Sequence, residues 1–367
     1  METLTDSLTW TETWGRDLQL AGCEVCDWLY LLPPDRLPLQ CPHCGRAPLT
    51  PLDETADRPV YTRPPELAVP FSVAPAKLES GIERFARDIW FAPLDLKPQT
   101  LLSRLQRLYL PVWLVDTRVE ATWQAEVGFD YQVVSHQEKY ANDQWNTREV
   151  KETRIRWEPR AGRLQRPYDN VMAPALEDQP QMDRRLGRYE HTAARLFGAA
   201  DLDEALVRLP NRAADDAWRE AVAALQQRAA DECRQAAAAD HLRDFRWSPA
   251  YHDQNWTQLL LPLYATYYLD DDDQPQTVLI HGQSGRVDGR RRASMKRAQW
   301  VALRITVVAA VVFVFSLALA LAGLAGLVSA DLLTYATIGL VAGIFIGAAA
   351  VAPIAIAWQF NKANRHT

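Results

Sequence analysis

Hydrophobic residues run without a charge in two places near the C-terminal end of the chain. Positions 305–330 contain no charged residue, and neither do positions 332–360. Within them, 305–328 and 333–360 are each long enough to cross a hydrocarbon core of ~30 Å, which takes roughly 20 residues of helix. The short link around 329–334 allows only a tight reversal. The pattern therefore predicts a transmembrane helical hairpin over 305–360.

Charged residues on either side of the hairpin predict its orientation. Basic residues fill a juxtamembrane segment, 286–304, and a tail, 361–367, whereas the link carries only Asp331. Because positive charge marks the cytoplasmic face, we expect a multi-pass protein of the cell (inner) membrane, embedded in the lipid bilayer, with both termini in the cytoplasm. The basic residues are Arg286, Arg290, Arg291, Arg292, Lys296, Arg297, Arg304, Lys362 and Arg365. The cluster at 291–297 also suits an anionic-lipid or nucleic-acid contact, although a topology signal is sufficient to explain it.

Small residues line one face of the second span. Gly339, Gly343 and Gly347 recur every fourth residue, which lets another backbone approach closely. Two interpretations remain open: packing within the hairpin, which we favour, and homo-oligomerisation through the glycines. Neither span contains the charged residues that ion and proton pathways usually require, so transport is not expected. Pro353 predicts a kink in the second span.

The residues ahead of the hairpin predict an α+β body over 71–285, which follows a proline-rich linker over 48–70. Apolar residues at helical spacing predict two short helices and one long helix. These helices are expected over 76–91, 98–108 and 213–241. The long helix carries Cys233 on its apolar stripe, and we expect this thiol to be buried in the core.

Strands are predicted where apolar and polar residues alternate. We expect antiparallel strands over 110–134 and 147–158, and a further hairpin that pairs 256–269 with 276–281. Four aspartates, 270–273, connect this last pair. They lack the spaced oxygen ligands and the glycine of a calcium loop, so they predict a solvated turn.

Charge and hydropathy are distributed unevenly. The 367 residues carry a formal charge of -6 and a mean hydropathy of -0.24, which hides the apolar spans. Residues 286–367 hold a net +7, which leaves -13 for residues 1–285. Because nucleic-acid affinity depends on basic residues that neutralise phosphates, an acidic body makes nucleic acid an unfavoured partner. The N-terminal residues contain acids and no apolar run, so no signal peptide is predicted.

Cysteine spacing predicts a metal site in the N-terminal segment, 1–47. Cys23 and Cys26 form one C-x2-C pair, Cys41 and Cys44 form a second pair, and fourteen residues separate the two pairs. This spacing is typical of a zinc ribbon in which four thiolates hold one structural Zn²⁺ and leave no position for water. Gly45 and Asp27 follow the pairs at positions where each turn often needs a positive φ. Iron in the same site and His43 as a replacement ligand are less favoured alternatives; His43 is expected to face solvent.

Three short motifs lie between the cysteine pairs and the apolar spans. They are Leu110-Pro-Val-Trp-Leu-Val-Asp116, Leu260-Leu-Pro-Leu-Tyr-Ala265 and His281-Gly-Gln-Ser-Gly-Arg-Val287. Together with the cysteines and the hairpin, they resemble a family of bacterial zinc-ribbon membrane proteins of unknown function, some of which are labelled as primosomal helicases. The family pattern has asparagine where this chain has His281. The resemblance implies the same architecture and brings no activity.

No enzyme class is indicated by the sequence. It contains no G-x4-G-K-[ST] phosphate loop, which excludes the helicase label, and no local pairing of a nucleophile with a base. His136, His191, His241 and His252 are scattered among polar neighbours. We therefore expect a non-enzymatic adaptor or assembly factor that presents a surface to unknown protein partners at the cytoplasmic membrane face. The alternatives are a membrane-tethered nucleic-acid-binding protein and, less favoured, an oligomeric pore.

Overall fold

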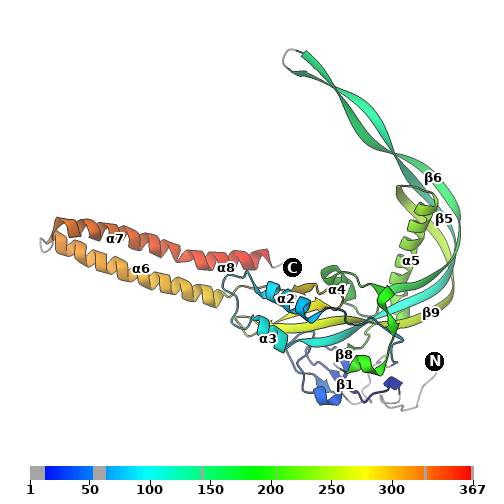
Figure 1. Ribbon diagram of the computed structural model, residues 1–367, viewed down its shortest axis with the longest axis horizontal. Coiled ribbons are helices and arrows are strands. Elements are labelled where there is room, and N and C mark those ends of the chain that lie inside the picture. Colours follow the sequence, from blue (N-terminus) through cyan, green and yellow to red (C-terminus); the bar gives the residue numbers. More distant parts are fainter. Residues whose placement is uncertain (1–12, 53–62, 142–143, 204, 326–328, 365–367) are drawn as a thin grey trace.

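The computed structural model describes residues 13–52, 63–141, 144–203, 205–325 and 329–364 (Figure 1). Several predicted features therefore fall partly outside the described residues. These are the start of segment 1–47, the middle of linker 48–70, the end of span 305–328 and the last residues of the tail, with Arg365.

One mixed, mainly antiparallel sheet organises the body. Its strands follow the order β11-β10-β9-β5-β8-β2-β1-β3, with β6 on β5, β4 on β9 and β7 on β4. Only the pairs β5–β8 and β4–β9 run parallel among the described strands. The strands are β1 Gln19–Gly22, β2 Leu29–Leu32, β3 Thr50–Pro51, β4 Leu67–Ala68, β5 Gln106–Ala141, β6 Gln144–Pro174, β7 Arg195–Leu196, β8 Ala205–Arg208, β9 His241–Leu269, β10 Pro275–His281 and β11 Val287–Gly289. The expected α+β class is confirmed.

Helices cover parts of this sheet and form the C-terminal hairpin. They are α2 Pro75–Ala86, α3 Pro98–Ser103, α4 Gln179–Leu186, α5 Ala214–Ala236, α6 Met295–Leu324, α7 Ala330–Ala349 and α8 Val351–Ala363, with short 3-10 turns η1 Pro34–Arg36, η2 His191–Ala193 and η3 Ala199–Leu202. The prediction of a helix over 98–108 is wrong in its second half, because α3 ends at Ser103 and β5 begins at Gln106. Leu108 pairs with both β8 and β9, so sheet pairing overrides its helical spacing.

Strands β5 and β6 are far longer than the expected 110–134 and 147–158. They pair from Val112↔Pro174 to Ala141↔Gln144, with one register shift between Val115 and Thr117, and curve away from the body as an arm (Figure 1). The predicted strand ended at 158, but β6 continues through Pro159 and Pro167. Because β6 pairs only with β5 among the described strands, these prolines lie on an edge strand, where proline is tolerated.

Helix α5 lies in the curve of the sheet (Figure 1). Its stripe of small residues, Ala217, Ala221 and Ala229 with Leu225, packs on β5 and β6. The helix ends at Ala236, and β9 starts at His241, so the expected end at 241 was too late because β9 extends further toward the N-terminus than predicted. Cys233 is buried on the same stripe, as expected, and burial raises the pKa of its thiol to about 11.

The cysteine segment continues the body's sheet. Strand β2 pairs with β8 through Tyr30↔Arg208 and Leu31↔Val207, and β1 pairs with β2 and β3. Buried residues of this segment share one core cluster with β5 and β9, including Cys23, Leu108 and Leu263. Within the segment expected as a linker, β4 also joins the sheet by pairing with β9.

Two apolar helical segments form an antiparallel hairpin that projects from the body (Figure 1). Met295–Leu324 and Asp331–Ala363 are both long and apolar enough to cross a membrane. The first helix starts at Met295, ten residues before the first expected span, with the Ser294 hydroxyl accepting a hydrogen bond from the Arg297 N–H at 3.0 Å. The second is interrupted at Ala350, between α7 and α8. Pro353 lacks the N–H that would bond back across this break, which fits the expected kink.

The glycines of the second span face α6. A Cβ added to Gly339 would collide with Ser316, one added to Gly343 would be crowded by Phe313 at 3.1–3.3 Å, and one added to Gly347 would touch Ala309. The glycines therefore allow α6 and α7 to pack closely within one chain, which is the interpretation that we favoured.

Candidate metal centre

Two turns of the same shape bring the four cysteines together. In the first, the Asp27 N–H donates to the Cys23 carbonyl at 2.9 Å, with Asp27 at φ 56°. In the second, the Gly45 N–H donates to the Cys41 carbonyl at 2.9 Å, with Gly45 at φ 64°. Both positive φ values were expected from the sequence. Each turn thus directs two thiols toward the same point.

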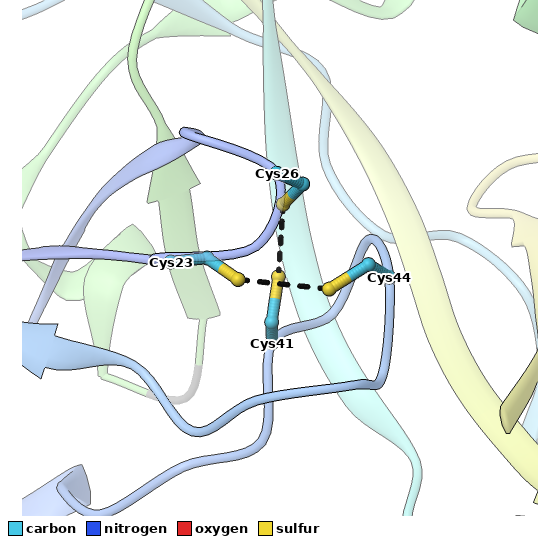
Figure 2. Close-up of side chains that lie close together, drawn as sticks. All are labelled: Cys23, Cys26, Cys41 and Cys44. Atoms are coloured by element: carbon cyan, nitrogen blue, oxygen red, sulfur yellow. Dashed lines mark hydrogen bonds between the residues drawn. The ribbon is translucent and has the colours of Figure 1, made fainter. Parts of the chain in front are cut away.

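The four sulfurs have the spacing of a tetrahedral site. The Sγ atoms of Cys23 and Cys44 are 3.6 Å apart, those of Cys26 and Cys41 are 3.7 Å apart, and all four lie within 4.8 Å of one another (Figure 2). Metal–sulfur bonds of about 2.3 Å in a tetrahedron place sulfurs about 3.8 Å apart. The cysteine set therefore fits one four-coordinate metal ion. Among the described residues, these four cysteines are the group of side chains that could hold a metal ion, and His43 is not part of it.

Contacts among the thiols favour the thiolate form at Cys41. A hydrogen bond with Cys26 lowers the pKa of Cys41 to about 4 and raises the pKa of Cys26 well above its ordinary value. Burial raises the pKa of Cys44. A cation held by all four sulfurs would favour the thiolate at each of them, so metal binding would release protons and stabilise the folded segment.

Polar groups around the sulfurs offset negative charge. The Arg46 N–H donates to the Cys44 Sγ at 3.4 Å, and the hydroxyl of buried Tyr30 lies 3.8 Å from the Cys41 Sγ. Such outer contacts orient metal ligands and tune their basicity.

A buried arginine supports the site from β8. Arg208 is 1% exposed and forms an ion pair with Asp178, with nitrogen–oxygen distances of 3.1 and 3.3 Å. Its guanidinium stacks on Trp28, which follows the first cysteine pair, and Trp28 stacks on His43 with ring centroids 3.4 Å apart. Burial lowers the pKa of Arg208 to about 10. No local sequence pattern marks Arg208, because it reaches the site through the pairing of β8 with β2.

His43 does not face solvent as expected. It is half-buried between the cysteine turn and Trp28, and burial lowers the pKa of its imidazole. Stacking against an aromatic neighbour removes the ring from water, which the loop sequence alone did not indicate. The carbonyl of His43 accepts a hydrogen bond from Thr277 on β10 at 2.8 Å, so this turn is also tied to the body.

The turn formed by the four aspartates, 270–273, is less exposed to solvent at one residue than the sequence predicts. The four residues connect β9 to β10 as predicted, but Asp270 is buried: its Oδ1 accepts hydrogen bonds from the N–H groups of Asp272 and Gln274, and its Oδ2 pairs with Arg292 at 2.9 Å. The carboxylate therefore holds the turn against the juxtamembrane segment.

His281 has a structural role in the turn that carries the third motif. It is buried and stacked on Tyr189, and its Nδ1 accepts hydrogen bonds from the N–H groups of Gln283 and Ser284, both at 3.1 Å. An asparagine side-chain oxygen makes the same type of contact in Asx turns. The histidine thus supplies the acceptor that holds this turn together.

Comparison with known proteins does not assign a family. No protein-family description, curated protein or solved structure matches this chain. The cysteine cluster and the two apolar helices are therefore the features that any functional proposal must use.

Proposed function

We propose that this chain is a membrane-anchored zinc protein that acts as a non-enzymatic adaptor or assembly factor. In this proposal the apolar hairpin spans the cell membrane, the basic flanks hold both termini in the cytoplasm, and the body offers a protein-binding surface there. Membership of the bacterial zinc-ribbon membrane family is part of the proposal. It is supported by the order of the cysteine cluster, the sheet and the hairpin along the chain.

The orientation is tested by labelling. A cysteine introduced at Ser329, in the link between the helices, should react with an impermeant thiol reagent in intact cells. A cysteine introduced at Asn364 should react only after the membrane is opened. The reverse pattern would place the body outside the cytoplasm.

Zinc is the metal that we propose for the cluster. Four thiolates in tetrahedral array suit Zn²⁺ and iron, and a closed structural site with two C-x2-C pairs is typical of zinc. Metal analysis of the purified chain should give one zinc per chain for wild type and for Cys233→Ser, and much less for Cys44→Ser. Iron at the same stoichiometry would contradict the assignment.

Removal of the metal should loosen a defined part of the sheet. Apparent binding free energies of structural zinc reach about 10–16 kcal/mol, so the cysteine segment should lose its folded state when a chelator is added. Hydrogen exchange should rise in β1, β2, β3 and both cysteine turns, while α6 and α7 remain unchanged. Unchanged exchange in β1–β3 would show that the segment folds without metal.

The observation that carries the adaptor proposal is the arm. Beyond Gly128↔His241, the last pair of β5 with β9, strands β5 and β6 pair only with each other. Tyr131, Val134 and Ile155 are exposed on this two-stranded part. A two-stranded ribbon buries too little apolar surface to be stable by itself. Its length and exposed apolar residues are therefore best explained by contact with another protein.

A shortened arm tests the proposal. Tyr131 pairs with Arg154, so residues 132–153 are replaced by Asn-Gly, which forms a two-residue hairpin turn at that level. The variant should keep its zinc and its membrane association but lose the partner that cross-linking identifies on the wild-type chain. A photo-reactive residue at Tyr131 should form a discrete adduct, and one at exposed Leu196, outside the arm, should not. Equal partner recovery by both chains would eliminate the arm as the docking element.

Nucleic-acid binding remains the less favoured proposal. Exposed arginines lie along β6, but most are already paired with carboxylates: Arg154 with Glu152, and Arg156 and Arg160 with Glu158. Such pairing leaves less positive charge for phosphates. Oligonucleotide binding at low salt that falls steeply as salt rises would instead support this alternative.

A further inference from the structure

A hollow lined by arginines lies where the body meets the apolar hairpin. It has a volume of about 470 Å³ and lies between α2, β11 and the residues that flank α6 and α8. Arg84, Arg286 and Arg291 line it, with Asn364 from the end of the hairpin. The lining carboxylate, Asp288, is 2.6 Å from Arg185 and is therefore already neutralised. The hollow thus carries an excess of positive charge.

Two of these arginines have no carboxylate partner among the described residues. Arg84 donates from Nε to the Ser80 carbonyl at 3.2 Å, which leaves its terminal nitrogens free for other contacts, and Arg286 has no ion pair there. Arg291 is anchored by a hydrogen bond to the Arg87 carbonyl and lies over the Phe360 ring. Guanidinium groups arranged in this way suit a phosphate, which accepts several hydrogen bonds at once.

The position of the hollow along the hairpin indicates which kind of phosphate group could reach it. Trp300 and Trp358 are exposed near this end of the hairpin, with the Arg304 and Lys362 cations 6.0 and 5.1 Å from their rings. Exposed tryptophans beside basic residues are typical of the membrane–water interface. Ala293 exchanges two hydrogen bonds with Asn361, at 2.7 and 2.9 Å, so α6 and α8 enter the body at the same level.

The loop between α2 and α3 lies at the same level. Its Phe91 carbonyl accepts a hydrogen bond from the Ser294 N–H at 2.7 Å, and its Ala92 carbonyl accepts one from Arg297 at 2.6 Å. Trp90 and Leu94 on this loop are 69% and 72% exposed. Large apolar side chains held beside the start of an apolar helix are placed to enter the headgroup layer.

We propose that the hollow binds the phosphate headgroup of an anionic phospholipid, and that the 87–94 loop inserts Trp90 and Leu94 into the same leaflet. This inference rests on the proposed membrane anchoring. The body would then lie on the cytoplasmic surface in one fixed orientation. An excess of positive charge would favour anionic over zwitterionic lipid.

The test uses the full chain in nanodiscs of phosphatidylcholine with or without phosphatidylglycerol. Native mass spectrometry of released protein should show preferential retention of phosphatidylglycerol. Arg84→Gln and Arg286→Gln should each lower this retention roughly 5-fold, the equivalent of about 1 kcal/mol. Arg154→Gln and Arg156→Gln, each made singly on the arm, remove the same charge away from the hollow and should have no effect. Equal zinc content and equal melting temperature in all variants establish that the substitutions leave the fold intact.

Hydrogen exchange supplies the second measurement. Phosphatidylglycerol should protect residues 87–94 in the wild type and not in the Arg84→Gln/Arg286→Gln variant. Inorganic phosphate added to phosphatidylcholine nanodiscs should not give this protection; if it does, the hollow takes free phosphate and the lipid assignment is wrong. Equal retention of both lipids also overturns the inference. If instead carbonate extracts the chain from membranes, the anchoring proposal itself fails.

Discussion

The ion pair between buried Arg208 and partly exposed Asp178 permits a quantitative test of how the metal centre is joined to the body. Arg208→Met keeps most of the apolar stem but removes the guanidinium that pairs with Asp178 and stacks on Trp28. Breaking a buried ion pair by removal of one partner costs about 3–5 kcal/mol, because the remaining charge is left uncompensated. Which partner remains should therefore decide the size of the effect.

The exposure of the two side chains predicts which single substitution lowers the unfolding free energy more. Asp178 keeps 27% of its side-chain area exposed, whereas Arg208 keeps 2%. Water can solvate the aspartate left by Arg208→Met, so this variant should lose about 3 kcal/mol of unfolding free energy. Asp178→Asn leaves a buried guanidinium with no carboxylate and should lose more, about 4–5 kcal/mol. The double variant removes both charges and should lose at least about 2 kcal/mol less than the sum of the single losses.

Thermal unfolding of the zinc-loaded full chain in detergent is the assay. A loss of 3 kcal/mol corresponds to about 6–12 °C in the melting temperature of a domain of roughly this size. Arg163→Met, at an exposed position on β6, is the matched control and should stay within about 0.5 kcal/mol. The reasoning would be refuted if the double variant lost as much unfolding free energy as the two single variants combined. It would also be refuted if Arg208→Met lost no more than Arg163→Met.

Two further substitutions test close packing and turn geometry. Gly343→Leu places a side chain where a Cβ would already lie 3.1–3.3 Å from Phe313, so it should lower the stability of the hairpin by about 1–3 kcal/mol. Val341→Leu, on the exposed face of the same helix, should leave the stability unchanged. Unfolding in mixed micelles measures both variants. His281→Ala leaves two backbone N–H groups without their acceptor and should cost about 1–3 kcal/mol in thermal unfolding, while His281→Asn restores an acceptor and should recover most of that loss.

Sequence patterns predicted the features that depend on local chemistry. The two C-x2-C turns, including the positive φ at Asp27 and Gly45, follow from residues within four positions of one another. The apolar hairpin follows from the length of charge-free sequence, and the stripe on α5 from helical spacing. Each of these signals is complete within one segment.

Features that depend on distant pairing were not predictable in this way. The strand predicted to end at 158 continues through Pro159 and Pro167, and the edge position of β6 makes these prolines acceptable. Leu108 fits a helix by spacing and a strand by its partners on β8 and β9. Arg208 gave no sign of its role because Trp28 and Asp178 approach it from separate segments. In each case the deciding contact lies more than twenty residues away in the chain.

The continuity of the sheet also changes how the cysteine segment should be tested. If this segment were a separate module, its deletion would be a clean test of docking. Because β2 pairs with β8, deletion of the segment would expose an edge of the sheet. It would also remove the His43 carbonyl, which accepts a hydrogen bond from Thr277 on β10. The same strand β10 leads from the turn in which Asp270 holds Arg292 at the base of the hairpin. A defect after deletion would therefore report damage to the body, whereas the shortened arm leaves every one of these contacts in place.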